Sequence, residues 1–214
     1  SAFSNGVDDI PDDKKPDHAR VGEAVYRTAK ELQGYISKLE EIRVPVIAAV
    51  HGGVIGGALD LITACDMRFA SNDAFFCIQE INIGMAADVG TLQRLPKIIP
   101  DSKMREMAYT GRRMLADEAK DSGLVGEVYE TQDEMLDAVH KLAAEIASKS
   151  PVAIYGLKAV MNYSRDHNVS DSLDFNALWS GAMLSQADMT EAMTAQMEKR
   201  DASFDKMVDV KKFN

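Results

Sequence analysis

The sequence is short of aromatic and cationic residues, and both shortages limit the class of protein. Aromatic residues make up 7% of the 214 residues, whereas methionine occurs 12 times. We therefore expect a core of aliphatic and thioether side chains. Lys and Arg number 24 against 34 Asp and Glu, which gives a formal net charge of -10. Because an acidic protein repels phosphate backbones, nucleic-acid binding is not expected.

Cysteine, histidine and long apolar runs are also scarce. Cys65 and Cys77 lie in apolar surroundings and form no CxxC pair, and the four histidines are scattered. We expect two buried, reduced thiols and no metal site. No apolar run reaches the roughly 18 residues of a membrane span, and the first residues do not resemble a signal peptide. Neither a membrane span nor secretion is expected.

The residues that are present predict an α/β protein that continues into helices. A helical pattern runs from residue 21 to 41, with Val25, Ala29, Leu32, Ile36 and Leu39 on one face. "PVIAAVHG" predicts a strand buried on both faces, and "MRFAS" and "AFFCI" predict two further strands. "TLQRLPKIIP" begins as a helix that stops near a proline. Later helices are predicted at 102–110, 116–122, 131–149, 151–165, 171–186 and 188–200.

A glycine-rich turn, "HGGVIGGALD", joins the first predicted strand to a helix. Gly56 and Gly57 fall at the N-terminus of that helix, where N–H groups are unpaired and the helix dipole is positive. Glycine lets a ligand approach such a backbone closely, so the Gly57 N–H is a candidate oxyanion donor. Tight packing of helix on strand is the alternative. The spacing matches neither GxGxxG nor GxxxxGK.

Three carboxylates stand in apolar surroundings. "EINIGMAADVG" carries Glu80 and Asp88, with Arg94 as the next cation, and Asp60 follows the glycines. Buried acids with raised pKa values are candidates for acid–base catalysis. From the residues alone, other interpretations stay open. Asp60 could be a first-turn helix charge, Glu80 a surface residue at a strand end, and Asp88 a helix N-cap.

Three separated motifs are together similar to one superfamily. "FSNGVD" resembles the F-S-x-G-x-D turn of the crotonase (enoyl-CoA hydratase/isomerase) superfamily. "PVIAAVHGGVIGGALDLITACDMRFAS" resembles its central signature, and "AFFCIQEINIGMAADVGTLQRLPKIIP" resembles the segment that follows. The acid pattern is similar to that of one branch, the Δ3,5-Δ2,4-dienoyl-CoA isomerases, and "AADVGTLQRLPK" is its most specific part. The likeness covers nearly all of the chain to about residue 204.

The resemblance implies a fold and a domain division. The expected fold is a crotonase-type ββα spiral core over residues 1–130, followed by a helical trimerisation region over 131–214. Family members carry strand and helix ahead of the F-S-x-G turn, so we expect N-terminal strands of the core to be missing from this sequence. A homotrimer or homohexamer is expected, in a mitochondrial or peroxisomal matrix or a bacterial cytoplasm.

The resemblance also implies a reaction: the double bonds of a 3,5-dienoyl-CoA shift to the 2,4 positions, in fatty acid β-oxidation. Asp88 would be the base at C2 and Glu80 the acid at C6, while Asp60 polarises or positions. The backbone N–H groups of Asn5 and Gly57 would hold the dienolate oxygen. No cofactor is expected, because CoA is part of the substrate.

Contacts to the acyl-CoA substrate are expected from four further residues. Gly56 lies beside the oxyanion donor, and "MEKRDASF" is similar to a family segment near the CoA nucleotide, sometimes that of a neighbouring subunit. This makes Lys199, Arg200 and Phe204 candidates, although a solvated helix end is the alternative.

Other functions stay open as well. An enoyl-CoA hydratase would use acids at positions 60 and 80, but the first is here the shorter Asp, and Asp88 is not expected. A dehalogenase-like attack by Asp88 would require an aromatic slot. A non-catalytic crotonase-fold binding protein would not need three acids.

Overall fold

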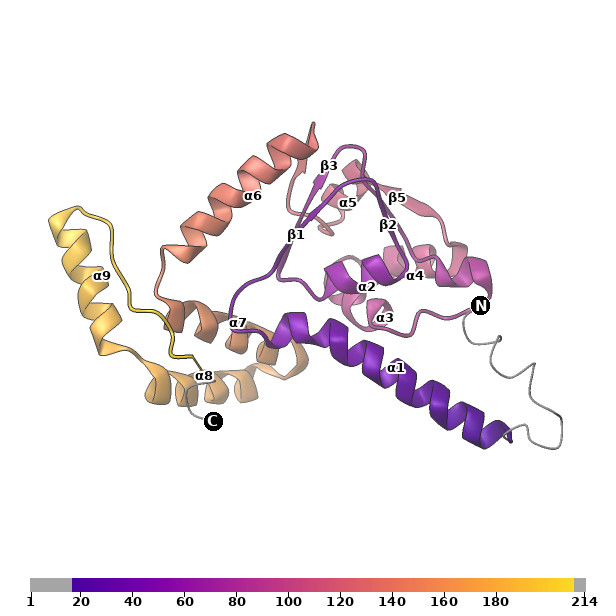
Figure 1. Ribbon diagram of the computed structural model, residues 1–214, viewed down its shortest axis with the longest axis horizontal. Coiled ribbons are helices and arrows are strands. Elements are labelled where there is room, and N and C mark those ends of the chain that lie inside the picture. The colour runs from indigo at the N-terminus through magenta and orange to yellow at the C-terminus, as the bar shows by residue number, and fades with distance from the viewer. Residues whose placement is uncertain (1–16, 210–214) are drawn as a thin grey trace.

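The structure is a computed structural model that describes residues 17–209 (Figure 1). Its first half mixes short strands with helices, and its second half is almost entirely helical, as the sequence predicts. In chain order the elements are α1 (His18–Glu41), β1 (Ile47–Val50), β2 (Gly53–Ile55), α2 (Gly57–Thr63), β3 (Met67–Ser71), β4 (Phe75–Cys77), the 3-10 helix η2 (Glu80–Ile83), α3 (Thr91–Arg94), the 3-10 helix η3 (Leu95–Lys97), α4 (Asp101–Thr110), β5 (Arg113–Leu115), α5 (Ala116–Asp121), β6 (Val128–Tyr129), α6 (Gln132–Ala147), α7 (Pro151–Asp166), α8 (Val169–Met183) and α9 (Gln186–Glu198).

The six strands of the described chain belong to two small sheets, and β1 to β4 alternate between them. One sheet has the parallel order β1-β3-β6, and the other has the order β2-β4-β5, in which β5 runs antiparallel to β4. A helix follows β2, and a group of helices follows β4, so each turn of the chain adds one strand to each sheet. This arrangement is the predicted ββα spiral.

The core lies between these strands and helices α2, α4 and α5. Leu59, Phe76, Met107, Met114 and Leu124 have no exposed surface. Phe76 is the one aromatic side chain among the buried residues of the described chain, and methionines fill positions that aromatics often take. The predicted aliphatic and thioether core is therefore confirmed.

Three details differ from the sequence-based expectation. Strand β1 is half-buried rather than buried on both faces, because it lies at the edge of its sheet. The residues Gly53–Ile55, expected in a turn, form strand β2. Helix α1 forms as predicted but contains no buried residue, and Val25 and Leu32 on its apolar face are each 44% exposed.

The C-terminal helices extend away from the spiral (Figure 1). Helix α6 packs on β1 and β3, whereas α7 and α8 pack on each other. Lys158 of α7, only 2% exposed, ties this part to the spiral. Its ammonium donates to the carbonyl oxygens of Leu39 and Val44 at 2.7 and 3.0 Å and to Asp66 Oδ2 at 2.8 Å.

Cys65 and Cys77 are buried free thiols, as predicted. Among the helices of residues 17–209, none combines the length and the apolar character that crossing a membrane requires.

Candidate active site

The turn between β2 and α2 fixes the direction of one backbone donor. Gly56 adopts φ 54° and ψ -120°, a conformation that glycine alone adopts readily. Its carbonyl accepts hydrogen bonds from the N–H groups of Leu59 at 2.7 Å and Asp60 at 3.2 Å. That carbonyl shares a planar trans peptide with the Gly57 N–H, which therefore points the opposite way, out of the helix.

Gly57 begins helix α2, as predicted. Its N–H makes no hydrogen bond within the part of the chain that the structure describes, and a Cβ placed on Gly57 would meet no atom within 4 Å. A donor that is fixed in direction and still unpaired has the properties of an oxyanion donor.

Asp60 is 1% exposed and lies in the first turn of α2. Its Oδ1 accepts the backbone N–H of Thr91 at 2.6 Å, across 31 residues of sequence. Thr91 is the first residue of α3, so the Asp60 carboxylate satisfies an N–H at the start of a second helix. It thereby fixes the end of the segment that carries Asp88.

Glu80 is half-buried and begins η2, with two residues between it and the end of strand β4. A Cβ on Gly56 would lie 3.0 Å from Glu80 Oε1, so this carboxyl group faces the glycine turn. Burial is the main cause that raises the pKa of Glu80, and the negative charges of Asp60 and Asp88 raise it further. The three acids thus share one electrostatic neighbourhood, and Glu80 holds a proton more readily than a free glutamate does.

Asp88 lies in the irregular segment between η2 and α3, and its side chain is exposed. It is not the N-cap of α3, because Gly90 occupies that position. The backbone carbonyl of Asp88 accepts a hydrogen bond from Gln33 Nε2 at 2.7 Å. Apolar side chains of the same stretch are also exposed: Ile81 by 43%, Ile83 by 66% and Met85 by 43%.

No Lys or Arg of residues 17–209 forms an ion pair with any of the three acids. An ion pair would lower a carboxyl pKa and weaken its use as a proton donor. The roles that the resemblance implies would place Asp88 and Glu80 on opposite sides of a mostly apolar cleft, and this position stays a prediction. Asn5, the second expected oxyanion donor, lies outside the described residues.

The structure does not bring the expected C-terminal contacts to these acids. Lys199 and Arg200 follow α9, at the opposite end of the molecule from α2 and α3 (Figure 1). Lys199 caps α9 in the left-handed conformation, with φ 54°. Arg200 is ion-paired with Glu191 at 2.6 Å, and hydrogen bonds from Arg200 lower the pKa of Glu191 to about 2. Arg200 is therefore already engaged by a carboxylate of the helix that precedes it.

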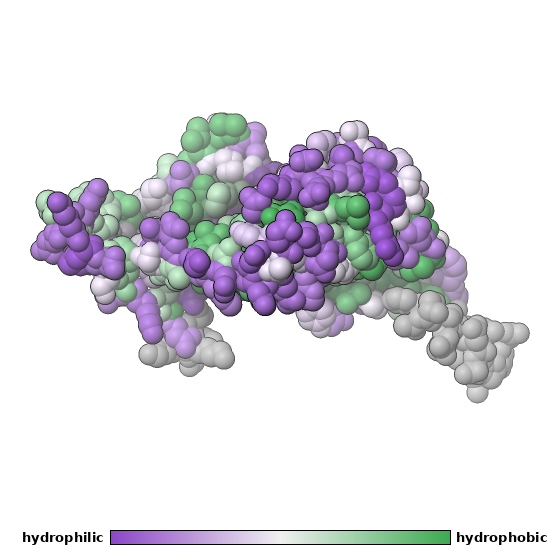
Figure 2. Space-filling view, turned by 90° about the horizontal axis from the view of Figure 1, so that it is seen from above, coloured by the Kyte–Doolittle hydropathy of each residue, from purple (hydrophilic) through white to green (hydrophobic). Residues whose placement is uncertain are grey.

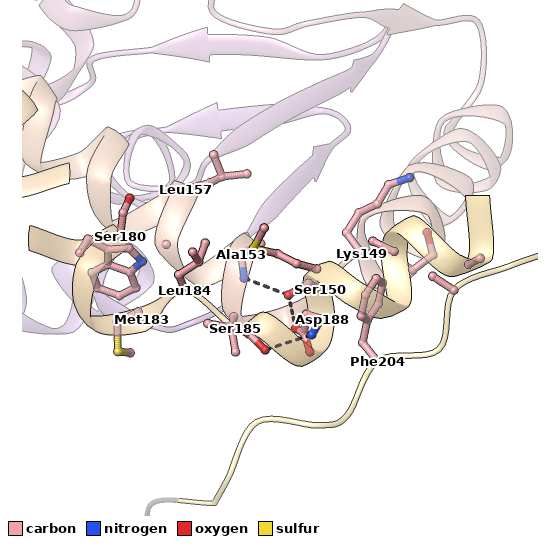
Figure 3. A pocket seen from close by; sticks show the side chains of 18 of the residues that line it. Lys149, Ser150, Ala153, Leu157, Ser180, Met183, Leu184, Ser185, Asp188 and Phe204 are labelled. Atoms are coloured by element: carbon pink, nitrogen blue, oxygen red, sulfur yellow. Dashed lines mark hydrogen bonds between the residues drawn. The ribbon is translucent and has the colours of Figure 1, made fainter. Parts of the chain in front are cut away.

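Phe204 lines a cavity of about 790 Å³ between α7, α8 and α9 (Figure 3). At its floor, Ser150 Oγ donates to Asp188 and accepts the N–H of Ala153 at 3.2 Å, while Ser185 Oγ accepts the N–H of Asp188 at 3.1 Å. These bonds cap α7 and α9. The cavity belongs to the helical region and contains none of the three acids.

Sequence reasoning missed the residues that hold the Asp88 segment. Gln33 is one, and Arg94 is another: its Nη2 donates to Ser37 Oγ at 2.9 Å and to Glu40 Oε2 at 2.8 Å. Both contacts join α1 to positions more than 50 residues later. Local sequence patterns carry no signal for such pairs.

A ββα spiral that places carboxyl groups beside a fixed backbone N–H defines a class of α/β proteins suited to acid–base chemistry next to an oxyanion. Residues 2–207 match the family described as Enoyl-CoA hydratase/isomerase, and the chain belongs to that family. The crystal structure of an enoyl-CoA hydratase from Bacillus anthracis superposes with a TM-score of 0.79 at 30% identity, over 85% of this chain and 70% of that one.

Two curated relatives share more of the sequence. The chain is 47% identical to the mitochondrial Delta(3,5)-Delta(2,4)-dienoyl-CoA isomerase of Rattus norvegicus, over 94% of this chain and 63% of that protein. It is also 47% identical to the peroxisomal Delta(3,5)-Delta(2,4)-dienoyl-CoA isomerase of Arabidopsis thaliana, over 89% of this chain and 69% of that protein. The chain thus spans less than two thirds of the length of the rat relative.

Proposed function

We propose that the protein is a Δ3,5-Δ2,4-dienoyl-CoA isomerase that acts on an acyl-CoA thioester in fatty acid β-oxidation. The observation that carries the proposal is the grouping of Asp60, Glu80 and Asp88 beside the Gly56–Gly57 turn, where the charges of Asp60 and Asp88 help to raise the pKa of Glu80. The names of the relatives at 47% identity support the same reaction.

The chemistry uses the two acids in different protonation states. Asp88, which is exposed, acts as the base and removes a proton from C2 of the substrate. The electrons of that C–H bond form a C1–C2 double bond, and the carbonyl pair moves onto the thioester oxygen to give the dienolate. When the carbonyl re-forms, the C1–C2 pair becomes the C2–C3 double bond, the C3–C4 pair becomes the C4–C5 double bond, and the C5–C6 pair takes a proton at C6. Glu80, whose pKa is raised by burial, delivers a proton to C6. The double bonds then stand at 2,4, and one proton has been taken up for each one lost.

The developing negative oxygen needs fixed donors. The Gly57 N–H supplies one, and we propose the N–H of Asn5 as the second. Gly56 has no side chain and would let the thioester approach the backbone closely. A side chain at this position would also press on Glu80. Asp60 serves as a positioning residue, because its carboxylate is engaged by the N–H of Thr91. The exposed side chains of Ile81, Ile83 and Met85 offer apolar surface for the acyl chain.

A hydratase is the competing function, and one experiment separates the two. Purified wild-type protein is given a 3,5-dienoyl-CoA, and the conjugated 2,4-dienoyl thioester is followed by its absorbance. Asp88→Asn keeps the shape and removes the base, so turnover should fall by roughly 10²–10⁴-fold. Glu80→Gln should also slow the reaction, less severely if water replaces the acid.

In a hydratase the order of the two variants reverses, because Glu80 would then act on the water. Near-full isomerisation by Asp88→Asn would show that the base is assigned wrongly. Rapid hydration of a 2-enoyl-CoA by a wild type that leaves the 3,5-dienoyl-CoA unchanged would establish the hydratase instead.

We also propose self-association as a homotrimer or homohexamer through the helical region. Hydrophobic side chains are exposed toward the C-terminal end of the molecule (Figure 2). Seven of them, each more than half exposed, are Leu157, Met161, Val169, Leu173, Leu178, Leu184 and Met193. If these side chains were buried between copies of the chain, their apolar surface would be removed from contact with water. A monomer in light scattering at micromolar concentration would contradict this proposal.

Self-association would also decide the role of the C-terminal residues. Lys199, Arg200 and Phe204 lie far from the acids of their own chain, so we propose that they contact CoA bound to a neighbouring copy. A mitochondrial or peroxisomal matrix is the proposed location, since relatives carry the names mitochondrial and peroxisomal, and a bacterial cytoplasm stays the alternative.

A further inference from the structure

The segment that carries Asp88 has few bonds of its own. Residues 85–90 form no regular element, and within the described chain none of the backbone N–H groups from 86 to 90 donates a hydrogen bond. Ala87 anchors the middle of the segment, since its side chain is 6% exposed and belongs to the core. At its two ends, the Met85 N–H donates to the carbonyl of Glu80 at 2.9 Å and the Gly90 carbonyl accepts from the first turn of α3, so the stretch between them depends on contacts with residues distant in sequence.

Helix α1 supplies two of these distant contacts. Gln33 Nε2 donates to the backbone carbonyl of Asp88 at 2.7 Å. One to two turns later, Ser37 and Glu40 bind the guanidinium of Arg94. That guanidinium fills the space beside Gly90, where a Cβ would collide with it. The helix therefore holds the segment at Asp88 and again just after its end.

Helix α1 is itself firmly held at its C-terminal end. The ammonium of Lys158 binds the carbonyl of Leu39, and Asn162 Nδ2 donates to the carbonyl of Glu40 at 3.0 Å. Arg165 pairs with the Glu40 carboxylate. Burial works to raise the pKa of Glu40, but hydrogen bonds from Arg94 and Arg165 outweigh it and keep the pKa below its usual value. Gln33 thus projects from a helix that α7 fixes in place.

We propose that Gln33 is a positioning residue that sets the direction of the Asp88 carboxylate by holding its backbone carbonyl, an inference that rests on the proposed isomerase function. The backbone carbonyl carbon and the side chain of Asp88 are both bonded to its Cα, so the orientation of one is tied to that of the other. Rotation of the unheld peptide would therefore swing the carboxylate away from C2. A small misplacement of a base lowers turnover without weakening substrate binding elsewhere.

The test compares two replacements of Gln33 with a control on the same helix. Gln33→Met keeps the length and removes the N–H donor, whereas Gln33→Glu keeps the shape and presents only acceptors when ionised. Loss of one hydrogen bond should lower kcat roughly 3- to 10-fold in Gln33→Met, and Gln33→Glu should be slower still, because its carboxylate repels the carbonyl. KM should stay within about twofold of wild type, as the lost contact touches no substrate. Lys30→Met, at an exposed position one turn earlier, should match wild type.

A second measurement does not depend on activity. Limited proteolysis, with the cleavage sites mapped by mass spectrometry, should show faster cutting within residues 84–90 in both Gln33 variants and unchanged cutting in Lys30→Met. Wild-type kcat together with wild-type cutting in Gln33→Met would overturn the proposal, and so would a rise in KM with kcat unchanged. A wild type without isomerase activity would refute the proposed function, while the cutting pattern would still decide whether Gln33 holds the segment.

Discussion

Replacing Lys158 with methionine should show how strongly the helical region is tied to the spiral. The lysine ammonium is the shared donor for two backbone carbonyls and for the carboxylate of Asp66. Methionine has a similar length and fills the same space, but it donates nothing. The change therefore isolates the loss of one charge and three hydrogen bonds from the loss of packing.

The magnitude follows from burial. Removing one partner of a fully buried ion pair costs about 3–5 kcal/mol. The side chain of Lys158 is 3% exposed, but that of Asp66 is 21% exposed, so water can reach the carboxylate once the ammonium has gone. Asp66 Oδ2 also keeps the N–H of Val46 at 2.7 Å. We therefore expect a loss of about 2–4 kcal/mol in the free energy of unfolding, which for a chain of this size lowers Tm by roughly 4–16 °C.

Urea unfolding followed by far-UV circular dichroism measures this loss. Protein concentration must be held constant, because self-association would add to the apparent stability. Lys141→Met, which removes an exposed lysine of α6, should change the free energy of unfolding by less than about 0.5 kcal/mol. The reasoning is refuted if Lys158→Met is as stable as this control. Adding Asp66→Asn to Lys158→Met should recover part of the loss, because the uncompensated charge is then gone.

Three further predictions concern the candidate site. Glu80→Gln should raise Tm at pH 8 and lose that advantage near pH 4. The raised pKa of Glu80 in the folded state destabilises the fold only at pH values above the pKa of the unfolded carboxyl, where that group is ionised. An equal Tm difference at both pH values in differential scanning calorimetry would contradict this. Gly90→Ala should cost about 1–3 kcal/mol in the free energy of unfolding by urea, because the φ of 139° and the Arg94 guanidinium both oppose a Cβ. Wild-type stability would contradict both causes. Asp60→Ala removes the acceptor of the buried Thr91 N–H and should lower the free energy of unfolding in urea by about 1–3 kcal/mol. Asp60→Asn keeps an oxygen acceptor and should lower it less. Equal losses in the two variants would argue against this hydrogen bond.

The helices of the second half could be predicted from the sequence because their ends carry local signals. Thr131, Ser150, Asn168 and Ser185 each accept a backbone N–H three residues later, which is the pattern of an N-cap. Pro151 adds a second signal at the start of α7. The expected starts and ends of α6 to α9 therefore lie within a few residues of those observed.

The short strand β2 and the support of the site could not be predicted in this way. Gly53–Ile55 is a strand because it pairs with Phe75–Cys77, and three residues with glycine at one end show no alternating pattern of their own. The bond from Asp60 to Thr91 and the bond from Gln33 to Asp88 likewise depend on how the spiral brings separate turns together. The acids themselves were found from a family likeness, since their surroundings are compatible with several ordinary roles.

The peptide between Gly56 and Gly57 has a consequence for how sites of this kind can diverge. Its carbonyl is locked by the first turn of α2, so the opposite N–H has no freedom to rotate toward a differently shaped ligand. No side chain controls its direction, and so substitution of neighbouring side chains cannot redirect it. A change in the direction of the Gly57 N–H therefore requires a rigid displacement of the whole helix α2. Comparison of proteins that share this turn should therefore find differences in the tilt and translation of α2, with the turn itself superposing closely from one protein to the next.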